Sequence, residues 1–334
     1  MRELCMGVNV DLGTAAVFRE QWMREAGPRN VSVNPIPILL KTDQAPGDAL
    51  AMTAAIYSLH CAHPKKYVTA VESLWPEIFE FNPDVVSAGS IPDASPVQMH
   101  YPAIHKSNQR GIHFMQGWCE FLGMALGVNI PLLTNRPHLY FSKPAPQECY
   151  WVICSGGKSD FTNKLWGHSN YQSVVDLLSD NICFIQVGDK KNDHQRLYGI
   201  VDAIGKTSLR ELFHLVRCAR GVVCGVSLIM HIAAALEKPA VVIAGGREPV
   251  QWNSYPKQQY VHTVGALPCS DIQGNIGGAC WRSRVVPLGD GTLLDNDTCE
   301  RPENGFPKCM NMISPTMVSE LVLRYNEKYE NVNC

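Results

Sequence analysis

Short apolar runs alternate along most of the chain with segments whose apolar residues recur every three or four positions. Runs bounded by turn residues predict strands, and the longer spacing predicts helices. The first half of the chain carries three expected strands and three expected helices. The strands lie at 36–41, 67–71 and 84–88, and the helices at 48–61, 75–81 and 113–126.

A second series of the same kind begins at Tyr150. Its strands are expected at 150–154, 182–187 and 200–202 and its helices at 171–178 and 208–220, followed by a strand–turn–helix–strand unit at 222–246 and a closing helix at 315–329. Ser208 and Glu211 form a capping box, and Gly221 is expected to stop the helix that they begin. Residues 89–110 are expected to form a loop.

Strands that alternate with helices favour parallel sheets covered by helices on both faces. The alternation runs twice, and the stretch KPAPQE (residues 143–148) has the composition of a linker. We therefore predict an α/β protein with two doubly wound, Rossmann-like domains at 1–146 and 147–267. A segment rich in Gly, Pro, Asp and Asn at 268–312 breaks the alternation, and residues 313–334 close the chain.

Composition narrows the class of protein without identifying it. The chain has 334 residues, of which 46% are hydrophobic and 18% charged, and its net charge is −2. This balance gives no electrostatic support for binding nucleic acid or a membrane surface. No apolar run is long enough to span a bilayer, and the N-terminus lacks the apolar region of a signal peptide. With 13 cysteines in a long chain of this kind, we expect a cytoplasmic protein with reduced thiols.

Two loops of the predicted sheets carry candidate chemistry, because ligands bind beyond the carboxyl ends of parallel strands. In the first, Gly47 would let a ligand approach the backbone, and Asp48 is either a helix N-cap or a general base. In the second, the glycines and lysines of 155–167 either receive a phosphate or form a solvated loop. The candidate contacts in this second loop are Ser155, Gly156, Lys158 and Lys164.

The turn Gly225-Val226-Ser227 is a third candidate. Ser227 is expected to be the N-cap of an apolar helix, whose first amides and dipole would favour an anion. Gly225 and Met230 belong to the same turn and helix start. His231 follows one residue later, and it is either a buried core histidine or a contact to that anion.

Taken in order, these motifs resemble glycosyltransferase family 9, the heptosyltransferases. The matching pieces are Gly47-Asp48-Ala49-Leu50, His63-Pro64, Asn82-Pro83, Lys164-Leu165-Trp166, the stretch from Gly205 to Leu212 and the stretch from Met230 to Pro239. The resemblance spans roughly residues 36–268. It implies a GT-B fold with an active site in the cleft between the two domains. It also implies metal-independent, inverting transfer of a sugar from a nucleotide donor, typically ADP-heptose, to a glycan or protein hydroxyl.

Residue by residue, the resemblance places the general base at Asp48 and the donor-diphosphate lysine at Lys164. It places the donor turn at Ser227, Met230 and His231. Members of the family usually carry an acidic residue and a glycine around that serine, where this chain has Val226 and Leu228. The resemblance therefore indicates how the donor diphosphate is bound more clearly than it indicates which sugar the donor carries.

Four cysteines are gathered in the segment that breaks the alternation. Cys269, Cys280, Cys299 and Cys309 are separated by 10, 18 and 9 residues, in a stretch with little apolar content. A structural tetrathiolate site for zinc or iron would replace the missing core, and free thiols are the alternative. The autotransporter heptosyltransferases, a branch of the same family, resemble this arrangement, with a C-terminal four-cysteine finger that binds iron.

Two other functions stay open at the level of sequence. A sugar-nucleotide 2-epimerase shares the expected architecture, although Val226 in the donor turn argues mildly against it. A non-catalytic nucleotide-sugar-binding protein of the same family is the other alternative. Homo-oligomerisation is also left open.

Overall fold

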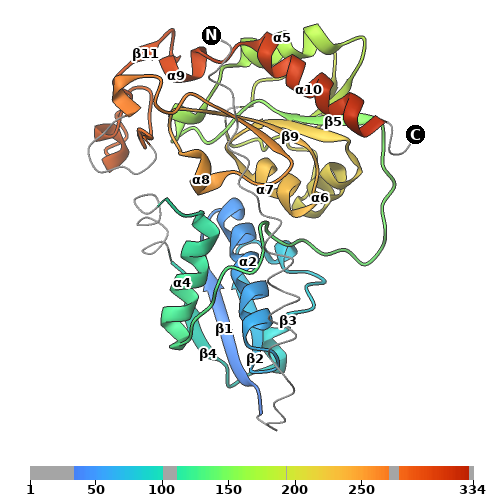
Figure 1. Ribbon diagram of the computed structural model, residues 1–334, viewed down its shortest axis with the longest axis vertical. Helices are drawn as coiled ribbons and strands as arrows, with labels where there is room; N and C mark the ends of the chain where they lie inside the picture. Colours follow the sequence, from blue (N-terminus) through green and yellow to red (C-terminus); the bar gives the residue numbers. More distant parts are fainter. Residues whose placement is uncertain (1–33, 101–110, 193, 271–277, 331–334) are drawn as a thin grey trace. The chain divides into compact units, whose positions relative to one another are not determined.

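The computed structural model describes residues 34–100, 111–192, 194–270 and 278–330. The N-terminal segment that we expected to lack a signal peptide lies outside these residues. Apart from Gly111, the described residues divide into two compact units between Ser142 and Lys143. Each unit is an α/β fold with its own parallel sheet, and each is described by itself below (Figure 1).

The first unit is built on a four-stranded parallel sheet in the order β3-β2-β1-β4. Its elements are β1 (Ile36–Thr42), α2 (Pro46–Ala62), β2 (Tyr67–Ser73), η1 (Pro76–Ile78), β3 (Val85–Val86), η2 (Ala88–Ser90), β4 (Ser95–Gln98) and α4 (Phe114–Leu126). The apolar side chains of β1 and α2 form its core, since Leu40, Leu50 and Ile56 are fully buried. The helix α4 begins at its N-cap His113 and ends at Gly127, which has the left-handed conformation that favours glycine.

Two expectations for this unit were wrong. Strand β4 lies within 89–110, where we expected only a loop. It pairs with β1 at the edge of the sheet, so its sequence SPVQ can be polar and largely exposed, and it gives no apolar pattern. The helix expected at 75–81 is only the 3₁₀ turn η1, which starts at Pro76.

The second unit contains a six-stranded parallel sheet in the order β10-β9-β8-β5-β6-β7 (Figure 1). Its elements are β5 (Tyr150–Cys154), η3 (Thr162–Lys164), α5 (His168–Leu178), β6 (Cys183–Gln186), β7 (Val201–Asp202), α6 (Leu209–Cys218), β8 (Gly221–Gly225), α7 (Leu228–Ala235), β9 (Ala240–Gly245), α8 (Val250–Asn253) and β10 (Gln258–His262). Numbered within the unit, this is the Rossmann order 3-2-1-4-5-6. The direction of winding changes between β5 and β8, which fixes where a ligand is expected.

Gly221 does not stop a helix, contrary to our expectation. The capping box of Ser208 and Glu211 is present, but α6 ends at Cys218 and Gly221 begins β8. A Cβ at position 221 would lie 2.6 Å from the ring of Trp151, which is itself buried in the neighbouring strand. This glycine therefore makes room for a tryptophan of the core.

The remaining elements follow the second sheet in sequence. They are η4 (Pro268–Ser270), η5 (Leu293–Asn296), β11 (Pro302–Glu303), β12 (Phe306–Pro307), α9 (Lys308–Asn311) and α10 (Pro315–Glu330). Residues 278–312, together with Cys269, form what we call the cysteine segment.

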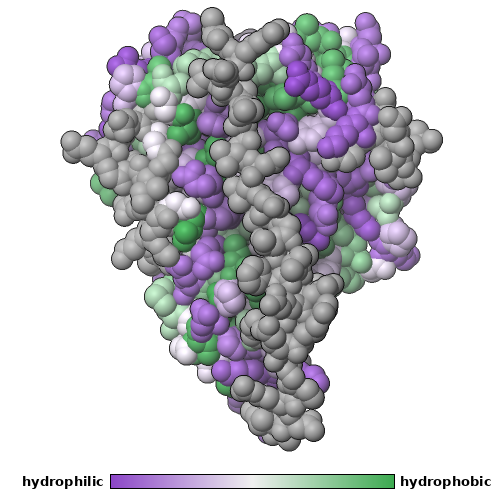
Figure 2. Space-filling model, viewed as in Figure 1, coloured by the Kyte–Doolittle hydropathy of each residue, from purple (hydrophilic) through white to green (hydrophobic). Residues whose placement is uncertain are grey.

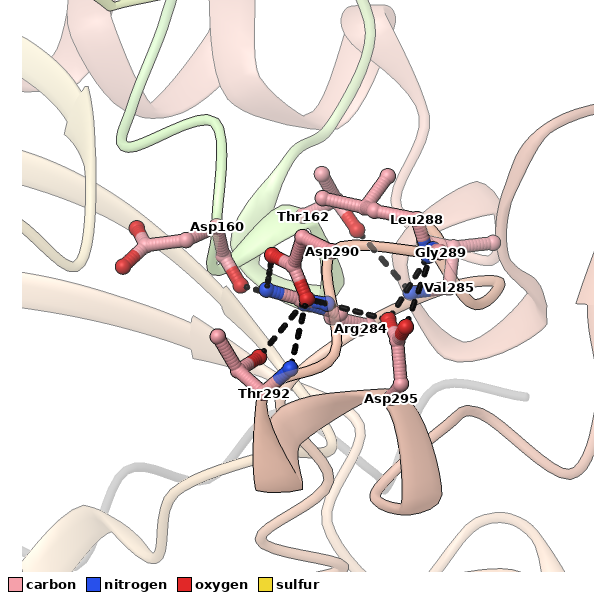
Figure 3. A network of polar contacts seen from close by, with 9 residues as sticks. All are labelled: Asp160, Thr162, Arg284, Val285, Leu288, Gly289, Asp290, Thr292 and Asp295. Carbon is pink, nitrogen blue, oxygen red and sulfur yellow. Dashed lines mark hydrogen bonds and ion pairs between the residues drawn. The ribbon is translucent and has the colours of Figure 1, made fainter.

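Polar contacts organise much of the cysteine segment. The buried Arg284 binds the carboxylates of Asp290 and Asp295 and donates from Nε to the Asp160 carbonyl at 3.2 Å (Figure 3).

No helix among the described residues is long and apolar enough to cross a bilayer. On the face shown in Figure 2, hydrophilic residues are interspersed with smaller groups of hydrophobic ones.

Candidate functional site

The loops after β5 and β8 meet where the winding of the second sheet changes direction. The carbonyl of Lys164 lies 3.5 Å from where a Cβ of Gly225 would stand, and the carbonyl of Ile243 lies 3.8 Å from the same point. The lysine-bearing loop is thus packed against the turn that begins α7. In doubly wound sheets this position, beyond the carboxyl ends of the strands, is where ligands bind.

Ser227 occupies the N-cap position of α7, as predicted, but it does not cap the helix. Its hydroxyl donates to the Gly225 carbonyl at 3.3 Å, and no side chain accepts a hydrogen bond from the first amides of α7 at this cap. A helix start without a side-chain cap presents N–H groups and the positive end of the dipole. The turn therefore has the properties of an anion site.

His231 lies in the buried first half of α7, with 7% of its surface exposed. Its Nδ1 is 2.8 Å from the hydroxyl of Tyr255, and the two rings meet edge to face. Met230 is fully buried, and its carbonyl accepts from the side-chain amide of Gln258 at 2.9 Å. These contacts hold both residues firmly on the helix.

Lys164 makes an ion pair that the sequence did not predict. Its ammonium lies 2.7 Å from Oε1 of Glu248, which is only 2% exposed and follows β9 in the chain. Arg247 binds the same oxygen, and Asn253 donates to Oε2 at 2.8 Å. Burial alone would raise the pKa of Glu248, but Lys164 and Arg247 outweigh it and lower the pKa to about 2.

Two cations thus share one buried carboxylate, which leaves one positive charge in excess. The guanidinium of Arg247 lies 5.5 Å from the ring centre of Phe161 and 5.9 Å from that of Trp281. The sequence carries one signal for this group that we missed. Gly245-Gly246-Arg247-Glu248-Pro249 follows β9, the neighbour of β8, and so lies at the same edge of the sheet.

The substitution Glu248→Gln is expected to destabilise the folded protein by roughly 3 kcal/mol at pH 7. The pKa of the carboxyl falls from 4.5 to about 2 in the folded state, and each pKa unit corresponds to about 1.4 kcal/mol. A depressed pKa stabilises the fold above the unfolded value, so this contribution is full above about pH 4.5 and disappears toward pH 2. Denaturant unfolding of both proteins from pH 7 to pH 2 measures the difference.

The matched control for this prediction is Glu72→Gln, since Glu72 pairs with Lys41 at the surface. An exposed pair contributes at most about 1 kcal/mol. Equal losses in the two variants would contradict a special role for the buried carboxylate.

The other predicted residues of the β5 loop have different surroundings. Ser155 is 8% exposed and accepts a hydrogen bond at 2.9 Å from Gln186, so it joins β5 to β6 within the core. Gly156 follows it at the end of the strand. Lys158 is exposed, with its ammonium 6.0 Å from the ring centre of Phe161.

In the first unit, Asp48 lies in the first turn of α2 and is not its N-cap. Ala45 is the N-cap, and Pro46, Gly47 and Asp48 are the first three helical residues. The position follows the carboxyl end of β1, and the strand order of this sheet also changes direction beside β1. Partial positive charge at a helix start stabilises a carboxylate there. The N-cap alternative is therefore wrong, and a role of Asp48 as a general base stays a prediction.

The four cysteines predicted as metal ligands line a single cavity. Its volume is about 10 Å³, which is room for about one water-sized sphere. Burial raises the pKa of Cys280 to about 11 and raises the pKa of Cys299 and Cys309. A metal ion would have to displace the protons of these thiols.

The donor set fits a tetrathiolate ion in number, chemistry and available volume. Within the described residues, however, no three His, Cys, Asp or Glu side chains stand in an arrangement that would hold a metal. The cysteines share a cavity but are not drawn together into ligand positions. Cys269, Cys280, Cys299 and Cys309 are the side chains that would hold an ion.

Comparison with known proteins assigns the class. Residues 131–275 match the model of glycosyltransferase family 9 (heptosyltransferase). Together with the fold, this match makes the protein a glycosyltransferase. Its residues 131–275 are a family 9 region. The region includes Lys164, the α7 turn and Glu248, whereas Asp48 and Cys280 lie outside it. No curated protein matches the chain.

Solved structures show the same fold at low identity. The iron-containing dodecameric glycosyltransferase TibC from enterotoxigenic E. coli is 18% identical, with a TM-score of 0.61, over 89% of this chain and 78% of its own. ADP-heptose LPS heptosyltransferase II from E. coli is 14% identical, with a TM-score of 0.56, over 88% and 100%. A family 9 glycosyltransferase from Veillonella parvula is 10% identical, with a TM-score of 0.61, over 89% and 99%.

A further structure of TibC contains ADP-D-β-D-heptose. At these identities the likeness concerns the fold, which is that of the GT-B glycosyltransferases, as predicted.

Proposed function

We propose that this protein transfers a heptose, or a related sugar, from ADP-heptose or another nucleotide sugar to an acceptor hydroxyl, with inversion at the sugar carbon. The observation that carries the proposal is the anion site of the second unit. There a helix start without a side-chain cap adjoins the loop of Lys164 at the point where the sheet changes its direction of winding. The family 9 match and the ADP-heptose complex of TibC support the choice of donor.

The anion site would bind and stabilise the leaving diphosphate. Negative charge grows on the diphosphate as its bond to the sugar breaks. Backbone amides of α7 and the ammonium of Lys164 are fixed donors that stabilise this charge without a catalytic metal. We propose that Gly225 and Ser227 shape the turn, that Met230 and His231 support it, and that Ser155, Gly156 and Lys158 flank it.

Asp48 is our candidate for the general base on the acceptor side, with Gly47 allowing close approach of the substrate. Its carboxylate would accept the proton of the acceptor hydroxyl as that oxygen forms the new bond to the sugar. The bond to the diphosphate breaks on the opposite face, which gives inversion. A glycan or a protein serine would supply the hydroxyl.

The donor turn favours no particular sugar. Val226 is 9% exposed and apolar, so it offers no hydrogen bond to a sugar hydroxyl. A panel of nucleotide sugars tests the proposal most directly. Release of ADP from ADP-heptose in the presence of an acceptor, with transfer of the heptose, is the expected result. If the protein bound none of the nucleotide sugars in the panel, the proposed function would be contradicted.

We further propose that the four cysteines hold one structural ion, iron or zinc, which stabilises the cysteine segment and takes no part in the chemistry. TibC, which has the same fold, is described as iron-containing and dodecameric. The oligomeric state and the cytoplasmic location of this protein stay predictions.

Cys280→Ser and Cys309→Ser are expected to lower the bound metal from about one ion per chain to near zero and to lower the melting temperature. A tetrathiolate ion contributes folding free energy directly, so its loss destabilises the segment. Elemental analysis of the purified protein and thermal unfolding are the measurements. Cys183→Ser, at an exposed cysteine of β6, is the control. If Cys280→Ser kept the metal content of the wild type, the metal site would be contradicted and the four cysteines would be free thiols.

A further inference from the structure

Asn163 connects the cysteine cavity to the lysine loop. It directly precedes Lys164, is 1% exposed and lines the cavity of the four cysteines. Its side-chain nitrogen donates to the Arg282 carbonyl at 3.1 Å and lies 3.8 Å from Sγ of Cys280. Its backbone N–H donates to the Ser283 carbonyl at 3.1 Å. Main chain and side chain together attach this residue to the cysteine segment.

The same short stretch also holds the second cation. The Arg282 carbonyl accepts a further hydrogen bond from Nε of Arg247 at 2.7 Å. The backbone N–H groups of Cys280 and Trp281 donate to the carbonyls of Gly246 and Arg247, each at 3.1 Å. The Arg282 carbonyl oxygen therefore accepts one hydrogen bond from Asn163, which precedes Lys164, and another from Arg247.

A neighbouring set of contacts fixes the segment on the same loop. Nε of Arg284 binds the Asp160 carbonyl, and the backbone N–H of Val285 donates to the Thr162 hydroxyl at 2.9 Å (Figure 3). The stretch 160–163 is thus bonded along its length to residues 282–285. A change in the cysteine segment has a direct hydrogen-bonded route to the backbone of Lys164.

We propose that Asn163 and the Arg282 carbonyl form a link through which the cysteine segment positions Lys164 and Arg247 for the donor diphosphate. Asn163 is a positioning residue, because it touches the segment and the lysine loop but supplies no charge of its own. This inference rests on the proposed function for the identity of the anion. The link itself is independent of that identity, since it is made of bonds within the protein.

The test compares the affinities of the full-length protein for ADP and AMP in the wild type and in Asn163→Leu. The leucine keeps the volume of the side chain but removes the amide donors. We expect the ADP-to-AMP affinity ratio to fall about 10-fold, in the usual range of coupling between sites. General destabilisation would weaken both nucleotides alike, whereas misplaced cations weaken the diphosphate selectively.

Ser283→Ala is the matched control. It removes a hydrogen bond of 2.6 Å to Asp297 at a buried residue of the same segment but leaves the link intact. Its affinity ratio should stay within twofold of the wild type. A wild-type ratio in Asn163→Leu would overturn the link.

Hydrogen exchange separates failure of the link from failure of the proposed function. Relative to the wild type and to Ser283→Ala, Asn163→Leu should speed amide exchange at Cys280 and Trp281 by at least several-fold, because the N–H groups of these residues donate to the carbonyls of Gly246 and Arg247 from the stretch that Asn163 holds. Exchange within α2 of the first unit should not change. If the wild type binds no ADP, the proposed function fails and exchange alone decides the link. Unchanged exchange at Cys280 and Trp281 overturns it.

Discussion

Asp48→Asn is expected to lower the rate of sugar transfer by about 10²–10⁴-fold, the usual contribution of a positioned general base. The amide has nearly the same shape as the carboxylate but cannot accept the acceptor proton. Since Asp48 lies in the first turn of α2, loss of its charge should cost only about 0.3–1 kcal/mol of stability. Steady-state kinetics with ADP-heptose, together with ADP binding by calorimetry, separates these effects.

The control for this prediction is Asp43→Asn. Asp43 is an exposed aspartate in the loop between β1 and α2, close to Asp48 in the chain. It should transfer sugar at the wild-type rate. Both variants should bind ADP as the wild type does. Transfer by Asp48→Asn within a few-fold of the wild type would contradict the assignment of the base and would favour another acidic residue.

Lys164→Ala is expected to weaken ADP binding by about 10–100-fold, because a hydrogen bond to a charged group contributes about 1.5–3 kcal/mol. AMP binding should change less, since the lysine is assigned to the diphosphate. The variant should also be less stable, because Glu248 keeps only Arg247 as its cationic partner in the ion pair. Lys164→Arg should recover part of the affinity. Calorimetric titration with each nucleotide gives the affinities directly.

Lys257→Ala serves as the comparison, since Lys257 pairs with Glu237 at the surface of the same unit at 3.5 Å. Neither nucleotide affinity nor stability should change appreciably there. If Lys164→Ala bound ADP as tightly as this control, the diphosphate site would have to lie elsewhere.

Strand β4 and the 3₁₀ turn η1 are elements that the pattern of apolar residues did not predict correctly. Strand β5, between Tyr150 and Cys154, is buried along its whole length and was predicted with its bounds. An edge strand of four residues with a proline buries too little to leave an apolar pattern. Gly221 was misjudged for a related reason. The space that a glycine leaves for Trp151 depends on a strand about 70 residues earlier in the chain.

Some residues of the candidate site could likewise be selected from the sequence, and others could not. Motif order along the chain was enough to select Lys164, the Gly225–Ser227 turn and His231, because loops that follow strands of one parallel sheet meet at one edge. The buried carboxylate of Glu248 was not selected. Arg247 is its neighbour in the chain, but nothing in the local sequence shows that Lys164, which lies far earlier in the chain, pairs with the same carboxylate.

By itself, the sequence determined the two α/β series, the loops that carry the candidate chemistry and the set of four cysteines. Each of these depends on residue type and spacing, which act locally. Only the tertiary structure decided that Lys164 and Arg247 share Glu248, that His231 has Tyr255 as its partner and that the cysteines line one cavity joined to the lysine loop by Asn163. Apart from the adjacent pair Arg247 and Glu248, the hydrogen bonds and ion pairs among these contacts join residues 24 to 119 positions apart in the sequence. Their geometry exists only once the sheet has brought its loops to one edge.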